Sequence, residues 1–232
     1  MVKMTKAKMA LLAVGLVILV GSSGLIGLFF GNFGNRTKPA NLIRVACVGD
    51  SITEGSEYPA DLQVMLGANY QLRNFGVSGS TVLFSSDRPY MNQTAYQKSK
   101  AFQPSIVIIM LGTNDAREST YESIDNFSAD YMKLISEYQT LVSKPKIWLV
   151  KPPPIFENDL NLSETNLVQG VIPQIEQVAN ELDLPTIDVN TALINYPEYF
   201  GDGVHPSSEG AMFIASEISQ AVTFNGVPVD TP

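Results

Sequence analysis

The chain has 232 residues, of which 45% are hydrophobic and 16% are charged. This length and apolar content are enough for one domain with a large core, and they exclude disordered, collagen-like and coiled-coil proteins. The formal net charge of -8 argues against nucleic-acid binding, because phosphate contacts need an excess of Lys and Arg. One Cys and one His exclude internal disulfides, thiolate metal clusters and metal sites built from two imidazoles. Any reaction that needs an imidazole must use His205.

Residues 1–35 form a predicted N-terminal segment. Three lysines precede an apolar stretch at residues 10–30, which is about as long as a helix that crosses a bilayer. We therefore expect a hydrophobic helix that is either a cleaved signal peptide or an uncleaved membrane anchor. The apolar run continues past the small residues at 21–24, which slightly favours the anchor. Because the lysines favour a cytoplasmic N-terminus, we expect an extracytoplasmic protein, membrane-anchored or secreted.

After a predicted linker at residues 36–41, the pattern of the chain predicts an α/β domain over residues 42–224 and a tail at 225–232. Short apolar runs alternate with longer amphipathic segments, as strands alternate with helices. The runs Ile43–Val48 and Ser105–Leu111 are continuous, which is typical of neighbouring central strands in a parallel sheet. Further strands are predicted at 71–75, 146–150 and 186–189, and helices at 60–66, 124–141, 168–182 and 211–222. The expected fold is a three-layer α/β/α sandwich with a five-stranded parallel sheet, preceded by the N-terminal hydrophobic helix.

The loops after the strands are the places to look for a site, because open parallel sheets bind ligands at the carboxyl ends of their strands. The first loop lacks the Lys-Ser/Thr pair of a phosphate-binding loop, and its acidic residues would repel polyphosphate. Thr53 also stands where the nucleophile elbow of the α/β-hydrolases needs a second Gly. The chemistry-bearing loops are Gly49-Asp50-Ser51, Gly76-Val77-Ser78-Gly79, Gly112-Thr113-Asn114-Asp115 and Asp202-Gly203-Val204-His205.

These loops contain the groups that acyl transfer needs. The Ser51 hydroxyl becomes a good nucleophile when the His205 imidazole takes its proton, and Asp202 lies one tight turn before His205. The backbone N–H groups of Ser51 and Gly79 and the side-chain amide of Asn114 can stabilise the developing oxyanion. Cys47 lies inside an apolar strand, so we expect a buried core residue and not a rival nucleophile.

The four blocks Gly49-Asp50-Ser51, Gly79, Gly112-Thr113-Asn114-Asp115 and Asp202-x-x-His205 resemble the sequence blocks of the GDSL or SGNH hydrolases, from Val45 to about Ile218. The resemblance implies the flavodoxin-like fold of that family over residues 42–224. It also implies a Ser51 nucleophile, a base of His205 with Asp202, and an oxyanion hole of Ser51, Gly79 and Asn114. No metal or organic cofactor is expected. Ile52 departs from the family name, and Ser207 follows His-Pro where Asn or Thr is frequent, but neither change touches these groups.

A narrower resemblance, carried by residues 88–90, 104–117, 152–154 and 202–210, is to the bacterial branch described as sialate or acetylxylan O-acetylesterases. It implies a serine esterase that removes short acyl groups, above all acetyl, from a small-molecule or carbohydrate ester. Three alternatives stay open: a lipase, lysophospholipase or thioesterase for longer chains, an extracytoplasmic polysaccharide O-acetyltransferase, and, least favoured, a non-catalytic carbohydrate-binding module. The membrane is a further partner if the N-terminal segment is not cleaved.

Four more residues are predicted to shape a substrate pocket because they lie in or near the same loops: Arg88, Tyr90, Arg117 and Phe156. Apolar residues are few in these loops, whereas hydroxyl and amide side chains are many. Long acyl chains need an apolar groove, and sugars need directional hydrogen bonds. The composition of the loops therefore favours short acyl groups on carbohydrate.

Overall fold

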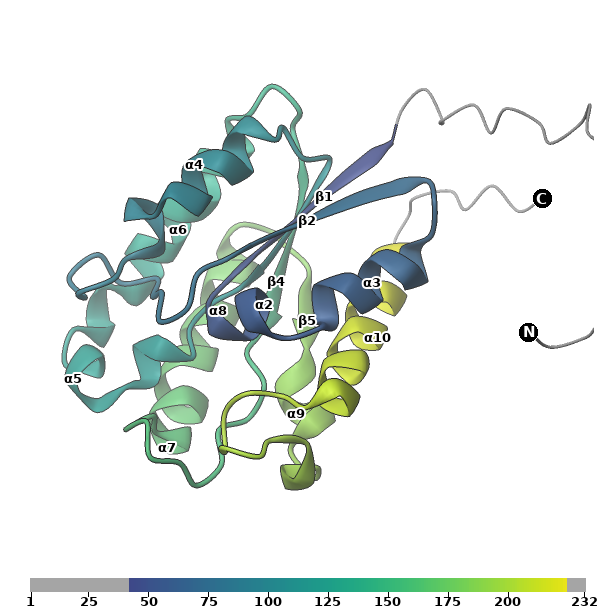
Figure 1. Cartoon of the computed structure of the whole chain (residues 1–232). Coiled ribbons are helices and arrows are strands. Elements are labelled where there is room, and N and C mark those ends of the chain that lie inside the picture. The colour runs from purple at the N-terminus through teal and green to yellow at the C-terminus, as the bar shows by residue number, and fades with distance from the viewer. Residues whose placement is uncertain (1–41, 225–232) are drawn as a thin grey trace, which may run out of the picture. The chain divides into compact units, whose positions relative to one another are not determined.

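The computed structural model describes residues 42–224, which form a five-stranded parallel sheet with helices on both faces (Figure 1). The strand order is β2-β1-β3-β4-β5, so the chain changes direction across the sheet at β1. The strands are β1 (Ile43–Gly49), β2 (Tyr70–Gly76), β3 (Ile106–Met110), β4 (Lys146–Lys151) and β5 (Thr186–Asp188). All five predicted strands are confirmed, including the pairing of the two continuous apolar runs as β1 and β3.

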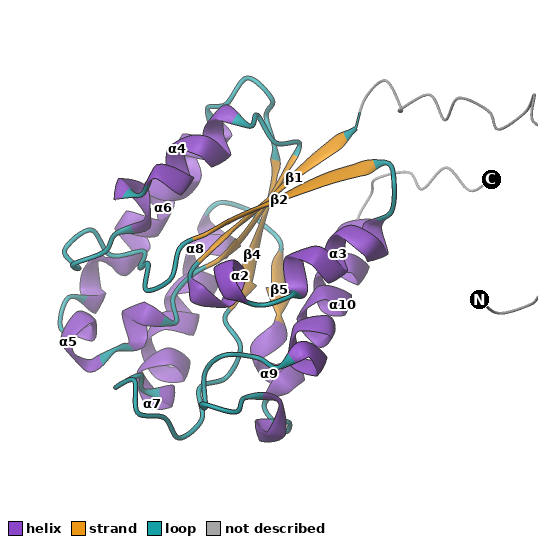
Figure 2. Cartoon of the chain, in the orientation of Figure 1, coloured by secondary structure: helices purple, strands orange, loops and turns teal. Residues whose placement is uncertain are grey.

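Alternation along β1 divides the core into two layers, because successive side chains of a strand point to opposite faces. Ala46 and Val48 belong to the core on one face, and Val45 and Cys47 belong to the core on the other. The first face is covered by α4 (Thr94–Ala101), α6 (Phe127–Gln139) and α8 (Ile172–Glu181), and the second by α3 (Tyr58–Leu66), α9 (Val189–Leu193) and α10 (Ser208–Phe224) (Figure 2). The three layers agree with the sequence pattern, and Cys47 is fully buried as predicted.

The shorter helices lie in the connections. They are α2 (Ser51–Gly55), α5 (Glu118–Tyr121) and α7 (Glu164–Asn166), the 3-10 turns η2 (Tyr90–Asn92), η3 (Asn114–Ala116), η4 (Ile124–Asn126) and η6 (Pro197–Tyr199), and the π-turn η5 (Leu167–Val171). The predicted helix at 168–182 starts earlier, at Glu164, because Ser163 caps it by accepting a hydrogen bond from the N–H of Asn166 at 3.2 Å. Helix α4 was not predicted, since its sequence is mainly polar.

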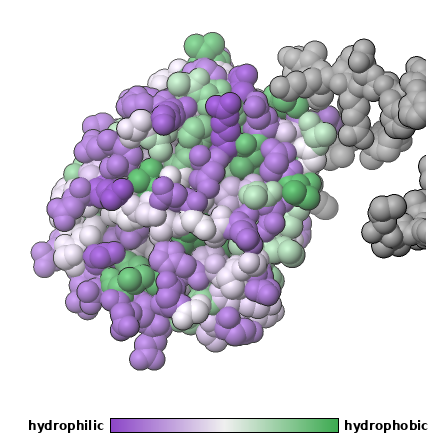
Figure 3. All heavy atoms as spheres, in the orientation of Figure 1, coloured by the Kyte–Doolittle hydropathy of each residue, from purple (hydrophilic) through white to green (hydrophobic). Residues whose placement is uncertain are grey.

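The predictions for residues 1–35 (a hydrophobic helix), 36–41 (a linker) and 225–232 (a tail) fall outside the described residues. Over residues 42–224, no helix has both the length and the apolar composition of a membrane span. The face of this domain seen in Figure 3 is mainly hydrophilic, with hydrophobic side chains in small separate groups.

Candidate active site

Ser51 stands directly after the first buried strand, at the start of α2. Strand β1 passes into α2 without a longer loop because Gly49 has no side chain: a Cβ there would lie 2.7 Å from the carbonyl oxygen of Met110. Asp50 caps the helix, since its Oδ1 accepts a hydrogen bond from the N–H of Ile52 at 3.0 Å. This contact holds the amide that follows Ser51 in place. The Ser51 hydroxyl is thereby placed at the carboxyl edge of the sheet.

The His205 imidazole lies between Ser51 and Asp202. Its Nε2 is 2.9 Å from Ser51 Oγ, and its Nδ1 is 2.6 Å from Asp202 Oδ2. The other Asp202 oxygen, Oδ1, accepts hydrogen bonds from the N–H groups of His205 and Val204 at 2.7 and 3.0 Å. When Nδ1 carries its proton toward the carboxylate, Nε2 is free to accept the proton of the hydroxyl. The structure therefore brings together the three side chains that the sequence analysis assigned to the triad.

Asp202 stays ionised in this arrangement. Partial burial raises the pKa of Asp202, but the hydrogen bonds from His205 and Val204 outweigh burial and lower that pKa to about 2. A charged carboxylate at Nδ1 fixes the orientation of the ring and stabilises its cation.

The turn that carries Asp202 and His205 is braced by the segment after β4. Gly203 has a φ of +81°, and a Cβ on it would lie 2.1 Å from the carbonyl oxygen of Glu157. In return, the N–H of Phe156 donates a hydrogen bond to the carbonyl of Gly203 at 2.8 Å. Only Gly tolerates both this φ and this close approach, so the turn cannot shift without disturbing the neighbouring segment.

Gly79 and Asn114, the predicted oxyanion-hole residues, lie on two adjoining loops. Asn114 is 6% exposed, and its Nδ2 donates to the carbonyl of Ser80 at 3.2 Å and, more weakly, to Asp50 Oδ2 at 3.4 Å. Asn114 thus contacts the residue before Ser51 and the residue after Gly79. Gly79 itself has a φ of +74°, which favours Gly.

Glu54 links the helix of Ser51 to the loop of Gly79, and the sequence analysis did not identify this role. Its Oε2 accepts hydrogen bonds from the backbone N–H of Ser78 at 2.7 Å and from the Ser78 hydroxyl. These bonds lower the pKa of Glu54. The two residues are 24 positions apart, and the only signal in the sequence is that Glu54 lies one turn of helix after Ser51. The contact keeps the loop of Gly79 beside α2.

Asp115 anchors the same loop from below. Its carboxylate is fully buried and accepts hydrogen bonds from the N–H groups of Val82 and Leu83 at 3.0 and 2.9 Å. Burial raises the pKa of Asp115 to about 7, although the two backbone hydrogen bonds act in the opposite direction. Burial likewise raises the pKa of Asp50 to about 6. Both carboxyl groups serve to hold backbone amides beneath the site.

A cavity of about 310 Å³ opens at Ser51 and His205. Ser51, Ile52, Gly55, Ser56, Ser78, His205 and Pro206 line it. None of the four predicted pocket residues is in this lining. Arg88 lies beside Gly79, since its Cδ would be 3.6 Å from a Cβ on that residue, and its side chain is exposed.

The other three predicted pocket residues have structural contacts. Tyr90 is fully buried, and its hydroxyl donates to the carbonyl of Phe75 at 2.8 Å, so its assignment to a substrate pocket is wrong. Phe156 packs its ring on Phe200, with centroids 5.3 Å apart, and supports the turn of Gly203. It also lines a separate cavity of about 470 Å³ beside that turn. Arg117 is partly buried and pairs its backbone with Leu162. Within residues 42–224, no group of three or more His, Cys, Asp and Glu side chains is placed to hold a metal ion.

Comparison with known proteins identifies the family to which this chain belongs. The model of the GDSL-like lipase/acylhydrolase family matches residues 47–212. An acetylxylan esterase of Xylanibacter ruminicola is 34% identical over 206 residues, which cover 78% of this chain and 43% of that protein. The chain spans about half the length of the curated relatives it matches.

Solved structures share the fold. The aryl esterase of M. smegmatis superposes with a TM-score of 0.63 at 19% identity, covering 78% of this chain and 98% of the other. A catalytic mutant of an acetylxylan esterase from Geobacillus stearothermophilus gives a TM-score of 0.61 at 24% identity, covering 80% and 96%. Because the family model spans more than half of the sequence and includes Ser51, Gly79, Asn114 and His205, the chain belongs to the GDSL-like lipase/acylhydrolase family, a family of carboxylic ester hydrolases.

Proposed function

We propose that this protein is a serine esterase that hydrolyses short acyl esters, chiefly acetyl esters of carbohydrate, through an acyl-enzyme. One observation carries the proposal: the His205 imidazole lies 2.9 Å from the Ser51 hydroxyl and 2.6 Å from the Asp202 carboxylate. A hydroxyl, an imidazole and an ionised carboxylate in this order are the groups that activate a serine for attack on a carbonyl. Family membership and the named acetylxylan esterase relative support the same reaction.

The first half of the reaction forms the acyl-enzyme. Ser51 Oγ attacks the acyl carbonyl carbon while its proton passes to His205 Nε2, and Asp202 stabilises the imidazolium. The carbonyl oxygen becomes an oxyanion that accepts hydrogen bonds from the backbone N–H groups of Ser51 and Gly79 and from Asn114. The bond to the alcohol oxygen then breaks, and His205 gives its proton to the leaving sugar hydroxyl. Water repeats these steps on the acyl-Ser51 and releases the acid.

One side-chain N–H of Asn114 makes only a weak hydrogen bond before an oxyanion forms. The N–H that it directs at Asp50 makes a long contact of 3.4 Å, which is weak compared with an ordinary hydrogen bond. An oxyanion beside Ser51 offers that N–H a charged acceptor, and hydrogen bonds to charged groups are the stronger ones. The bond to Ser80 keeps the amide in place meanwhile.

The small cavity supports the preference for short acyl chains. The lining around the Ser51 hydroxyl includes Gly55, Ser56 and Ser78, which offer little apolar surface to an acyl chain. Of the apolar loop residues near the site, Val82 and Leu83 are buried in the core of the fold and are not available to line a groove. Acetyl fits such a space, whereas a long chain would need continuous apolar contact.

The site of action is also a proposal, and it rests on the sequence of residues 1–35 alone. We infer that the domain works outside the cytoplasm, held by an anchor or released after cleavage. N-terminal sequencing of the protein from its membrane or medium fraction tests this. A mature N-terminus near Ser22 to Gly24 indicates cleavage, an intact one indicates the anchor, and recovery of the intact chain from the cytosol contradicts both.

The experiment that tests the function is a series of p-nitrophenyl esters from acetyl to decanoyl, run with and without a sugar acceptor and with Ser51→Ala as the blank. We expect kcat/KM to be highest for acetyl or propionyl, to fall beyond butyryl, and acetate to be released from an acetylated oligosaccharide. Preference for octanoyl or longer chains would indicate the lipase or thioesterase alternative. Faster transfer of acetyl to sugar than to water would indicate an acetyltransferase. If no ester is turned over, the alternative of a non-catalytic carbohydrate-binding module remains.

A further inference from the structure

Three aromatic rings gather on the surface where η6 meets the first turns of α10. The rings of Tyr196 and Tyr199 are stacked, with centroids 5.3 Å apart and planes 6° apart. Phe213 lies 5.7 Å from Tyr196 at an angle of 41°. We call Tyr196, Tyr199 and Phe213 the aromatic platform. The mechanism proposed above uses none of these residues.

Two rings of the platform are held by the core, and the third is more exposed. Tyr199 and Phe213 are partly buried and pack against the core under α10, whereas 36% of Tyr196 is exposed. Two further apolar side chains near it in sequence, Ile194 and Met212, are 39% and 56% exposed. Single exposed apolar residues are common on soluble domains, whereas aromatic rings in mutual contact at the surface are a candidate binding surface.

The platform is joined to the rim of the catalytic cavity. The carbonyl of Tyr199 accepts a hydrogen bond from the N–H of Ser207 at 2.7 Å, two residues after His205. Gly210 separates Tyr199 from Pro206, since a Cβ on it would lie 3.2 Å and 3.0 Å from their Cβ atoms. Pro206 lines the cavity at Ser51. The triad turn and the platform are therefore consecutive parts of one packed segment.

We propose that the aromatic platform is a sugar-binding subsite that holds the carbohydrate chain whose ester is cleaved at Ser51. The inference rests on the proposed function and narrows its substrate to oligosaccharides or polysaccharides. The cavity at Ser51 has room for an acyl group and the atoms beside it, so the rest of a sugar chain must leave past its rim. A ring face packs well against the C–H groups of a pyranose, and the tyrosine hydroxyl offers a hydrogen bond at its edge.

The test compares two substrates on the full-length chain. In Tyr196→Ala, we expect KM for acetylated xylo-oligosaccharides to rise by about fivefold or more, because apolar contact area is lost. Turnover of p-nitrophenyl acetate, which carries no sugar chain, should be unchanged. Tyr196→Phe keeps the ring face and should restore most of the affinity. Val64→Ala on α3, where Val64 is 80% exposed, is the matched surface control.

Three results would overturn the subsite. The first is an unchanged KM for the oligosaccharide in Tyr196→Ala. The second is an equal loss of activity on both substrates, which would show a purely structural role. The third is a change in oligomeric state on gel filtration with unchanged kinetics. Calorimetric binding of deacetylated xylo-oligosaccharide separates the subsite from the esterase proposal. If no ester is hydrolysed while Tyr196-dependent binding persists, the function fails and the subsite stands. If p-nitrophenyl acetate is hydrolysed but the oligosaccharide does not bind, the subsite fails alone.

Discussion

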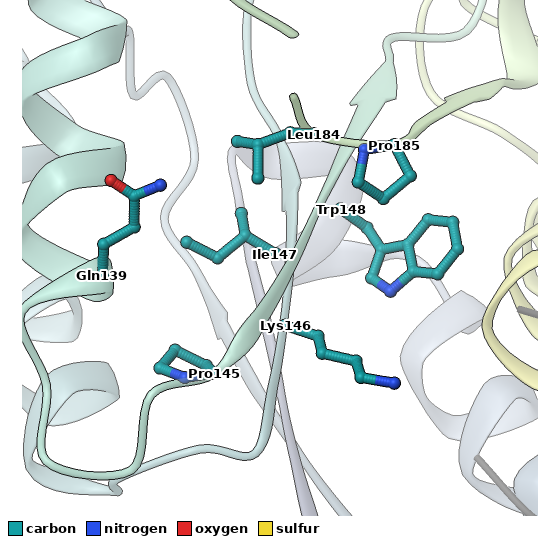
Figure 4. A pocket seen from close by; sticks show the side chains of 7 residues that line it. All are labelled: Gln139, Pro145, Lys146, Ile147, Trp148, Leu184 and Pro185. Atoms are coloured by element: carbon teal, nitrogen blue, oxygen red, sulfur yellow. The ribbon is translucent and has the colours of Figure 1, made fainter. Parts of the chain in front are cut away.

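The two edges of the sheet carry different kinds of cavity. At the carboxyl edge, a cavity of about 310 Å³ is lined by Ser51 and His205. At the amino ends of β4 and β5, a larger cavity of about 410 Å³ lies between the end of α6 and the strands (Figure 4). Its lining is largely apolar and consists of Gln139, Pro145, Lys146, Ile147, Trp148, Leu184 and Pro185. In Figure 4, Ile147 and Trp148 point to opposite sides of β4, as neighbouring strand residues do.

The contrast shows that size and apolar lining do not by themselves locate the chemistry. At the carboxyl edge, side-chain carboxylates hold the backbone of the loops: Asp50 holds Ile52, Glu54 holds Ser78, and Asp115 holds Val82 and Leu83. A reacting group needs this support because its catalytic effect depends on fixed geometry. The lining of the amino-edge cavity includes neither a hydroxyl nor an imidazole. Its apolar side chains belong to the packing at the ends of the strands.

The largest effect is expected for the triad. Ser51→Ala and His205→Ala should each lower kcat by a factor of about 10⁴ or more, and the double variant should be little worse than either, because the residues act as a unit. Steady-state kinetics on p-nitrophenyl acetate measure the loss, and circular dichroism checks the fold. Near-normal turnover by His205→Ala would refute the mechanism, since the chain contains no second imidazole.

A smaller loss is expected for Asn114→Ala. The amide contributes mainly when the carbonyl oxygen becomes an oxyanion, so kcat should fall by about 10²–10³ while KM changes little. Initial-rate kinetics on an acetyl ester separate the two constants. If KM alone changes, Asn114 binds the substrate and does not stabilise the transition state.

The brace of the triad turn can be tested with two neighbouring glycines. Gly203→Ala places a methyl group against the carbonyl of Glu157 at a φ that disfavours side chains, so Asp202 and His205 must move and kcat should fall by about 10²-fold. Gly201→Ala is the matched control, because a Cβ there meets nothing within 4 Å. Steady-state kinetics on an acetyl ester give kcat for both variants. Equal activities would mean that the segment after β4 does not position the triad.

Part of this arrangement could be predicted from the sequence because it depends on local pattern. Continuous apolar runs predicted β1 and β3, and the order of the loops predicted which residues meet at the sheet edge. His205 was identifiable because it is the sole imidazole and follows Asp202 by one turn. Helix α4 carries no such pattern, because its sequence is mainly polar. Tertiary contacts, such as the burial of Tyr96, hold this helix on the sheet.

Contacts between distant segments could not be predicted. Tyr90 is an aromatic residue with a polar hydroxyl in a loop-like sequence, and contacts with distant segments, such as the hydrogen bond to the carbonyl of Phe75, make its burial favourable. The contact of Glu54 with Ser78 joins residues that no periodicity relates. The aromatic platform likewise depends on η6 meeting α10, which neither segment's own sequence specifies.

Activity should rise with pH along one acid limb, by about tenfold per pH unit, because only the neutral imidazole accepts the Ser51 proton. Asp202 adds no limb near neutrality, since its lowered pKa of about 2 keeps it ionised. The stability that Asp202 contributes is complete above its ordinary pKa and is lost as pH falls from there through about 2. A kcat/KM profile measures the limb. Asp50, with a raised pKa of about 6, is the rival group. A limb that disappears in Asp50→Asn would reassign the titration to that carboxyl.

The smallest effect on activity is expected at the amino edge. Leu184 lines the larger cavity and packs, partly buried, against the core on the α6 and α8 face. Leu184→Ala should therefore lower the free energy of unfolding by roughly 1–2 kcal/mol, less than for a fully buried leucine. Its kcat and KM for acetyl esters should be unchanged at a temperature where the variant is folded. Urea denaturation and kinetics on the same preparation give both quantities. A fall in kcat comparable with that of Gly203→Ala, with the domain still folded, would show that the amino-edge cavity takes part in the reaction and would remove the contrast between the two edges.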